Sequence, residues 1–235
     1  LETEATSQRV LYWVATQTST TRQLRHFSQT LLRFSNLTAT IPPDFSYQSW
    51  TTAFEQVAQL AQQERFVLIL DEFTYVMRAD SEVPSILQNV WDELLQHSQL
   101  FLILTGSLAG IIQRAALDYQ APLYGRATAR LKLQPLPFGV LTRFLPQMST
   151  EQRVAIYTVS GGIPAYIKQF NDQLNISDNL YECLVSPANV MLNDAVFLLR
   201  EQLDDPRNYL AVIETIAAGF HRLTEIGKMV GMAPN

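Results

Sequence analysis

Two adjacent carboxylates, Asp71 and Glu72, directly follow a run of five apolar residues, Phe66 to Leu70. The run predicts a buried strand, and such a strand cannot leave carboxylates unpaired without a large desolvation penalty. We therefore expect both acids to meet water, a cation or a metal bound to phosphate at the end of the strand. The alternative is a solvated turn between a strand and a helix, in which the acids only cap the helix.

A second apolar run, Leu100 to Leu104, also ends in polar residues, and these include Thr105 and Ser107. If both runs are parallel strands of one sheet, their carboxyl ends meet at the edge where such sheets bind ligands. Two hydroxyls would then lie beside Asp71 and Glu72, where they could sense a phosphate or a water. The alternative is that they cap a helix starting at Leu108, and both interpretations can hold together.

Arg126 lies in a glycine-containing loop, Pro122 to Arg126. A guanidinium there could face the phosphates of a nucleotide, in cis or across a subunit interface, and stabilise developing charge. The alternative is a structural arginine that pairs with an acid. Arg130 is a weaker candidate for the same role.

The elements expected to position these residues alternate between strand and helix. A further strand is predicted at Arg9 to Ala15, and amphipathic helices are predicted around Leu24 to Leu32, Trp50 to Leu60 and after Pro84. This alternation predicts an α/β fold with right-handed crossovers and a parallel sheet that helices cover on both faces.

Beyond these elements, the alternating residues Ala129 to Leu133 predict one more strand. From Phe138 onward only helical patterns follow, so we expect a helical domain with its boundary near Gln134 to Pro137. Ser160 to Pro164, with two glycines, predicts a tight connection into a helix. The C-terminal pattern from Tyr209 to Gly227 is typical of the first two helices of a helix-turn-helix, and the sequence stops before a recognition helix is complete.

The composition excludes several function classes. The net charge of -5, with 17 basic and 22 acidic residues, gives no global attraction to nucleic acid or anionic lipid, although local DNA contact stays open. The single cysteine, Cys183, excludes an internal disulfide and fits a reducing compartment. The histidines, His26, His97 and His221, show no metal-ligand spacing. Without a membrane-length apolar stretch or a signal pattern, a cytoplasmic protein with no membrane contact is expected.

Together these segments resemble the ATPase family found mainly in archaea and some bacteria, a branch of the AAA-like STAND P-loop NTPases. The segment LILDEFTYV resembles a Walker B motif. The other matching segments are LYWVATQTS, SILQNVWDELL, LFLILTGSLAGII, APLYGRAT, LKLQPLPF, SGGIPAYI and the C-terminal NYLAVIETIAAGFHRLTEIGKMVG. They cover nearly the whole chain in the order of the family.

The resemblance implies that the protein binds ATP and Mg²⁺. It implies that Asp71 coordinates the metal and that Glu72 activates the attacking water. It implies a sensing role for Thr105 or Ser107 and a phosphate-facing or switch role for Arg126. It also implies that the segment around Pro164 contacts the nucleotide. The expected domains are an ATPase core (1–136), a helical lid (137–205) and the start of a winged helix (206–235), which would switch with hydrolysis.

One motif of the family does not occur in this sequence. No G-x-x-x-x-G-K-[ST] is present, and Gly227-Lys228-Met229 lacks the upstream glycine and the hydroxyl residue. In the family this Walker A motif lies just upstream of the position of Leu1. We therefore expect the chain to be a fragment, inactive without that motif. The alternative hypothesis is a non-catalytic module that binds a protein partner, itself or DNA and uses the ATPase fold as a scaffold.

Overall fold

The computed structural model describes residues 9–36, 38, 40–107, 119, 121–185, 191, 194, 196–199, 203 and 205–232. The chain divides into two compact units, Leu1–Arg130 and Leu131–Asn235. In the described ranges, no helix combines the length and the apolar character needed to cross a bilayer.

The first unit is built on a parallel sheet of three strands. These are β1 (Arg9–Val14), β2 (Phe66–Asp71) and β3 (Leu100–Leu104), in the spatial order β1-β2-β3. Val14 pairs with Asp71, and Leu70 pairs with Leu104, so the carboxyl ends of all three strands lie at one edge. This arrangement confirms the predicted α/β fold with a parallel sheet.

Four α-helices connect or follow these strands in the described part of the first unit. They are α1 (Thr20–Ser35), α2 (Trp50–Gln63), α3 (Phe73–Ala79) and α4 (Val83–Glu93), with a short 3₁₀ helix η1 (Leu95–His97) after α4. The side chain of Ser49 accepts a 3.2 Å hydrogen bond from the backbone N–H of Thr52 and caps α2. Pro84 lies in the first turn of α4, as predicted.

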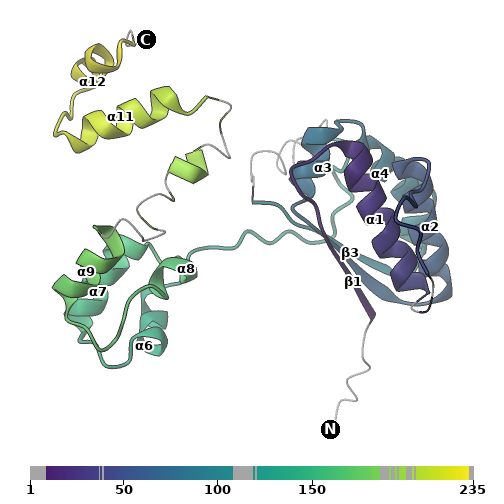
Figure 1. Ribbon diagram of the computed structural model, residues 1–235, viewed down its shortest axis with the longest axis horizontal. Coiled ribbons are helices and arrows are strands. Elements are labelled where there is room, and N and C mark those ends of the chain that lie inside the picture. The colour runs from purple at the N-terminus through teal and green to yellow at the C-terminus, as the bar shows by residue number, and fades with distance from the viewer. Residues whose placement is uncertain are drawn as a thin grey trace. The chain divides into compact units, whose positions relative to one another are not determined.

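These helices bury one face of the sheet. Leu11 and Trp13 of β1 and Leu70 of β2 join a single core with the apolar residues of the four helices, which Figure 1 shows on one side of the strands. The opposite face is more open, since Tyr12 is 55% and Phe101 is 52% exposed. We predicted helices on both faces, and the described helices cover one of them. The helix expected from Leu108 lies outside the described residues.

The strand predicted at Ala129 to Leu133 is wrong. These residues have no regular secondary structure, and the side chains of Leu131 and Leu133 are 86% and 83% exposed. An alternating apolar pattern forms a strand only where a neighbouring strand accepts its backbone hydrogen bonds. The ladders of the described sheet join β1, β2 and β3 and do not include this segment.

The second unit is helical, and its described residues form no strand, as predicted. Its elements are η2 (Phe138–Val140), α6 (Leu141–Phe144), α7 (Thr150–Ser160), α8 (Pro164–Ile167), α9 (Ile176–Leu184), α11 (Arg207–Ala217) and α12 (Leu223–Val230). A small core unites α6, α7, α8 and α9 through Leu141, Ile156, Ile167 and Cys183. Ser149 and Gln152 form a capping box that fixes the start of α7.

Gly162 holds the segment before η2 against the end of α7. Its carbonyl accepts a 2.8 Å hydrogen bond from the N–H of Leu136, and the Tyr157 hydroxyl donates to the Leu136 carbonyl at 3.0 Å. A Cβ on Gly162 would lie 2.3 Å from that carbonyl oxygen, and φ is +75°. Gly161, with φ of +57°, has nothing within 4 Å of such a Cβ. Only glycine therefore fits at position 162.

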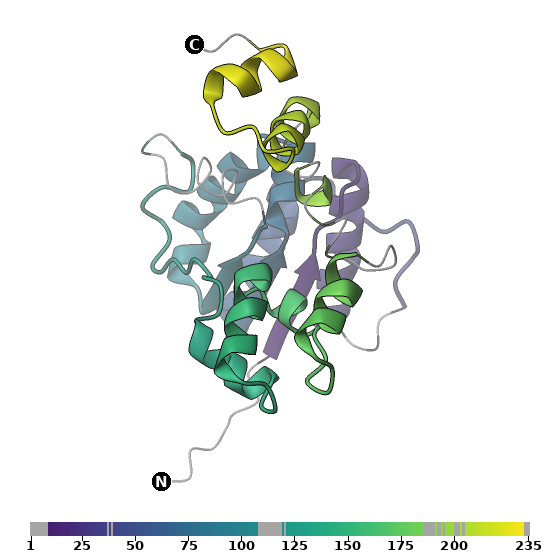
Figure 2. The ribbon, with the colours of Figure 1, turned by 90° about the vertical axis from the view of Figure 1, so that its left-hand side faces the viewer.

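The C-terminal helices α11 and α12 pack side by side, as both views show (Figure 1, Figure 2). They confirm the two predicted helices. Several of their apolar side chains are exposed, including Leu223 at 71% and Met229 at 62%. Two helices do not define a winged helix, so that assignment stays a prediction.

Candidate functional site

Asp71 is the last residue of β2, and three donors surround its half-buried carboxylate. Oδ1 accepts hydrogen bonds from the Thr105 hydroxyl and, at 3.1 Å, from the N–H of Glu72. Oδ2 accepts a hydrogen bond from the Tyr12 hydroxyl. The bonds from Thr105 and then Tyr12 lower the pKa of Asp71, and they outweigh the opposing effect of burial. Asp71 is therefore held as an anion at the edge of the sheet.

Tyr12 is a part of this site that the sequence analysis missed. The hydrogen bond to Asp71, together with burial, raises the pKa of Tyr12, so the phenol keeps its proton and remains a donor. Tyr12 pairs with Ile69 in the parallel register, two residues before Asp71. Only this register shows that Tyr12, two residues before the end of β1, lies near Asp71 at the end of β2. The sequence does not contain the register.

Glu72 adopts a left-handed backbone conformation, with φ of 52° and ψ of 38°. Among the described residues it is the one non-glycine residue with a positive φ. Such a conformation costs about 1–2 kcal/mol for a residue with a Cβ and often marks a functional position. It turns the chain sharply from β2 into α3, and the N–H of Phe73 then donates to the Thr105 carbonyl at 2.9 Å.

The Glu72 side chain is held at one oxygen only. Oε2 accepts hydrogen bonds from the N–H of Ser107 at 3.1 Å, from its hydroxyl at 3.0 Å and from the Thr74 hydroxyl at 3.4 Å. Within the described part of the chain, no hydrogen bond reaches Oε1. The carboxylate is thus oriented while one of its oxygens can still accept a proton or a hydrogen bond.

The electrostatics of the site favour a cation. None of the ion pairs among the described residues involves Asp71 or Glu72. Carboxylate and hydroxyl oxygens are hard ligands, and Mg²⁺ usually binds proteins through one or two carboxylates while keeping several waters. Asp71 uses three of its roughly four lone-pair positions, which leaves room for a hydrogen bond from a metal-bound water. The residues present therefore fit a hydrated Mg²⁺ held through water.

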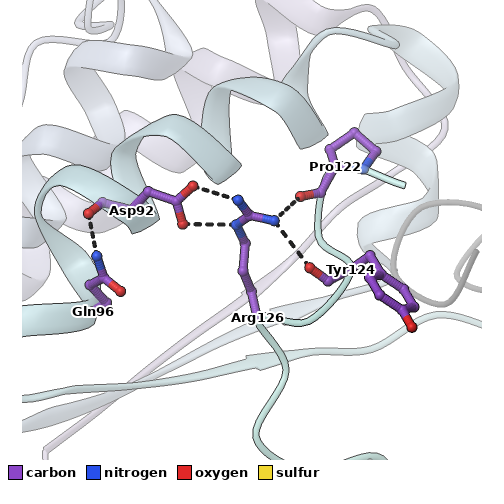
Figure 3. Close-up of polar contacts among 5 residues, drawn as sticks. All are labelled: Asp92, Gln96, Pro122, Tyr124 and Arg126. Carbon is purple, nitrogen blue, oxygen red and sulfur yellow. Dashed lines mark hydrogen bonds and ion pairs between the residues drawn. The ribbon is translucent and has the colours of Figure 1, made fainter. Parts of the chain in front are cut away.

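Arg126, in contrast, is occupied elsewhere (Figure 3). Its Nε and Nη2 donate to the two carboxylate oxygens of Asp92 on α4, at 2.8 and 2.5 Å. Its Nη1 donates to the carbonyls of Pro122 and Tyr124 at 2.9 and 3.0 Å. The hydrogen bond with Asp92 raises the pKa of Arg126 and lowers that of Asp92. In this structure the arginine is paired with an acid, which is the structural alternative from the sequence, and its catalytic role stays a prediction.

The structure thus brings together four of the six residues predicted to form the site: Asp71, Glu72, Thr105 and Ser107. Pro164 lies in the second unit, at the start of α8, and its nucleotide contact stays a prediction. No group of three or more His, Cys, Asp or Glu side chains arranged to bind a metal occurs in the described ranges.

The sequence model of a family described as ATPase domains found predominantly in archaea matches residues 2–170. The chain belongs to this family. The described fold agrees with a solved structure, the Walker-type ATPase PABY2304 of Pyrococcus abyssi, with a TM-score of 0.67. The match covers 95% of this chain and 72% of that chain at 17% sequence identity, and it supports a P-loop NTPase-like fold.

Two proteins of Methanocaldococcus jannaschii are similar in sequence. MJECL04 is 29% identical over 203 residues, which are 86% of this chain and 44% of that protein. MJ0424 is 39% identical over 54 residues, which are 23% of this chain and 52% of that protein. The chain thus matches less than half of MJECL04 and about half of MJ0424.

Proposed function

We propose that the protein binds ATP with Mg²⁺ and hydrolyses it, with Asp71 and Glu72 in distinct roles. The observation that carries the proposal is the pair of carboxylates at the end of β2. Each is oriented by a hydroxyl donor from the loop after β3, and neither forms an ion pair with a described residue. Membership in an ATPase family supports nucleotide binding.

In this proposal Asp71 would hold Mg²⁺ through water, and the metal would supply positive charge opposite the phosphates. Glu72 takes the proton of the attacking water at Oε1, to which no described residue donates a hydrogen bond, because Oε2 is fixed by Ser107. The water oxygen attacks the γ-phosphorus, the bond to the bridging oxygen breaks, and ADP leaves with the electron pair of that bond. Thr105 keeps Asp71 charged and would transmit a change at the phosphate to the strand.

The proposal extends to the organisation of the chain. We assign an AAA-like STAND architecture, in which residues 1–136 form the ATPase core, residues 137–205 a lid and residues 206–235 the start of a winged helix. Hydrolysis would switch the arrangement of these domains. We place the protein in the cytoplasm. The phosphate cradle G-x-x-x-x-G-K-[ST] is not among these 235 residues, and the proposal takes a segment outside them to supply the cradle and its lysine.

The test compares Glu72→Gln with the wild type in the full-length product of the gene. Binding of a fluorescent ATP analogue with Mg²⁺ should persist, because glutamine retains the acceptor oxygen. Phosphate release should fall by about 10²–10⁴-fold, because an amide cannot accept the proton of the water. Glu93→Gln is the matched control, since Glu93 is exposed at the end of α4 and its substitution should leave turnover unchanged.

Equal turnover of Glu72→Gln and the wild type would refute Glu72 as the base. Absence of Mg²⁺-dependent nucleotide binding by the full-length protein would refute the whole proposal. It would favour the alternative of a scaffold that binds its partner without nucleotide.

A further inference from the structure

A depression of about 520 Å³ lies beside α1, and none of the described residues that line it has a carboxylate. Its lining residues on α1 are Arg22, Arg25, His26 and Gln29. The loop Thr16–Thr18, which follows β1, completes its polar lining. Two of its lining residues, Arg22 and Arg25, carry positive charge in a chain whose net charge is -5.

This charge belongs to a long stretch of sequence without acids. Residues 5–43 contain four arginines and one histidine but no Asp or Glu. One of the arginines, Arg9, forms an ion pair with Glu64. For Arg22, Arg25 and Arg33 the described residues provide neither an ion pair nor a hydrogen bond, and all three are exposed. Three guanidinium groups are thus available to an external anion.

The helix places these groups on one face. Arg22, Arg25, Gln29 and Arg33 follow each other at spacings of three or four residues, so they lie along one side of α1. The buried residues of α1, which include Phe27, lie on the other side. From position 22 to position 33 the helix rises about 16 Å. The strip is longer than a single phosphate group.

Two hydrogen bonds fix the shape of this face. The indole N–H of Trp13, which is buried, donates to Nδ1 of His26 at 2.9 Å. Because Nδ1 is the acceptor, the ring proton is on Nε2, which is thereby a donor. The amide of Gln29 donates to the Pro43 carbonyl at 2.7 Å and ties the adjoining loop to α1.

We propose that this face of α1 binds phosphate groups along one strand of a nucleic acid. Arginine binds phosphate through two parallel hydrogen bonds, and contacts of this kind are independent of base sequence. The strip of about 16 Å is long enough to contact several successive phosphates of a flexible single strand. The proposal does not involve Asp71, Glu72 or the C-terminal helices.

The test uses the chain without nucleotide and a fluorescent oligothymidylate of about 20 nucleotides, and anisotropy is followed from about 25 to 200 mM KCl. The wild type should bind, and log K should fall linearly with log[KCl]. Arg22→Ala/Arg25→Ala should weaken binding and reduce that slope by about 1.4, because each phosphate contact to a single strand contributes about 0.7. The control Arg65→Ala/Arg143→Ala removes the same charge from two other exposed positions and should leave the slope unchanged.

Three results would overturn the proposal. One is no binding of the oligonucleotide at the lowest salt concentration. Another is an equal loss of slope in the two double variants, which would show a non-specific effect of charge. The third is competition by inorganic pyrophosphate at the same total phosphate concentration as the strand, which would show a site for a small free anion that needs no strand. Because no step requires ATP, these outcomes are independent of any failure of the proposed hydrolysis.

Discussion

Two neighbouring glycines at the end of α7 allow a paired experiment on the second unit. Both Gly161 and Gly162 have positive φ, but a Cβ meets nothing within 4 Å at position 161 and a backbone oxygen at 2.3 Å at position 162. Alanine at either position carries the left-handed penalty of about 1–2 kcal/mol, partly offset by about 0.4–1 kcal/mol from the less flexible unfolded chain. Gly161→Ala should therefore lower the free energy of unfolding by about 1 kcal/mol.

Gly162→Ala should cost more, because Leu136 has to move away. That movement breaks the hydrogen bond between Leu136 and Gly162 and the one between Tyr157 and Leu136. Each is worth about 0.5–1.5 kcal/mol, so the total cost should be about 3 kcal/mol. With a slope of about 1.5 kcal/mol per molar urea, the midpoint of the second unit should fall by about 2 M.

Urea unfolding followed by two signals measures this difference. Far-UV circular dichroism reports both units, whereas the tryptophans, Trp13, Trp50 and Trp91, all lie in the first unit. The fluorescence transition should stay in place while the dichroism transition of Gly162→Ala shifts. Equal midpoints for Gly161→Ala and Gly162→Ala would refute the close approach of Leu136 as the reason for glycine at position 162.

Two further substitutions test the contacts around the sheet edge. Thr105→Val should raise the pKa of Asp71, measured by carboxyl carbon NMR, because it removes the hydrogen bond that lowers this pKa most. In the folded protein the pKa of Asp71 lies below its ordinary value of 3.8, so the stabilisation by Thr105 should be complete above that pH. It should disappear as the pH falls through the lowered pKa. A stability difference between wild type and variant that is the same at neutral and strongly acidic pH would contradict this. Arg126→Ala and Asp92→Ala should each lower the urea midpoint. The double variant should lose less unfolding free energy than the sum of the two single losses, because the two side chains bind each other. Strict additivity would show that the ion pair contributes nothing.

The sequence predicted the elements whose apolar pattern is local. The three strands of the described sheet and α2 follow from runs or spacings of apolar residues, and Pro84 marked the start of α4. The grouping of Asp71 with Thr105 was also predictable, because parallel strands end at a common edge. These features depend on short segments and on one rule of topology.

The remaining features depend on partners far away in the sequence. Tyr12 reaches Asp71 through a strand register, and Arg126 pairs with an acid 34 positions away. No local pattern distinguishes an arginine that faces phosphates from one that pairs with an acid. The error at Ala129 to Leu133 has the same origin, because an alternating pattern does not reveal whether a neighbouring strand exists.

The exposed segment at Leu131 and Leu133 is a site where a protease can cleave the chain. Proteases cut extended, accessible backbone, and here trypsin can cleave after Arg130 and after Lys132. The cut falls between the two compact units and before Leu136, which stays bound to Gly162. Brief digestion would thus release an intact α/β piece and an intact helical piece, and each could be crystallised or labelled on its own.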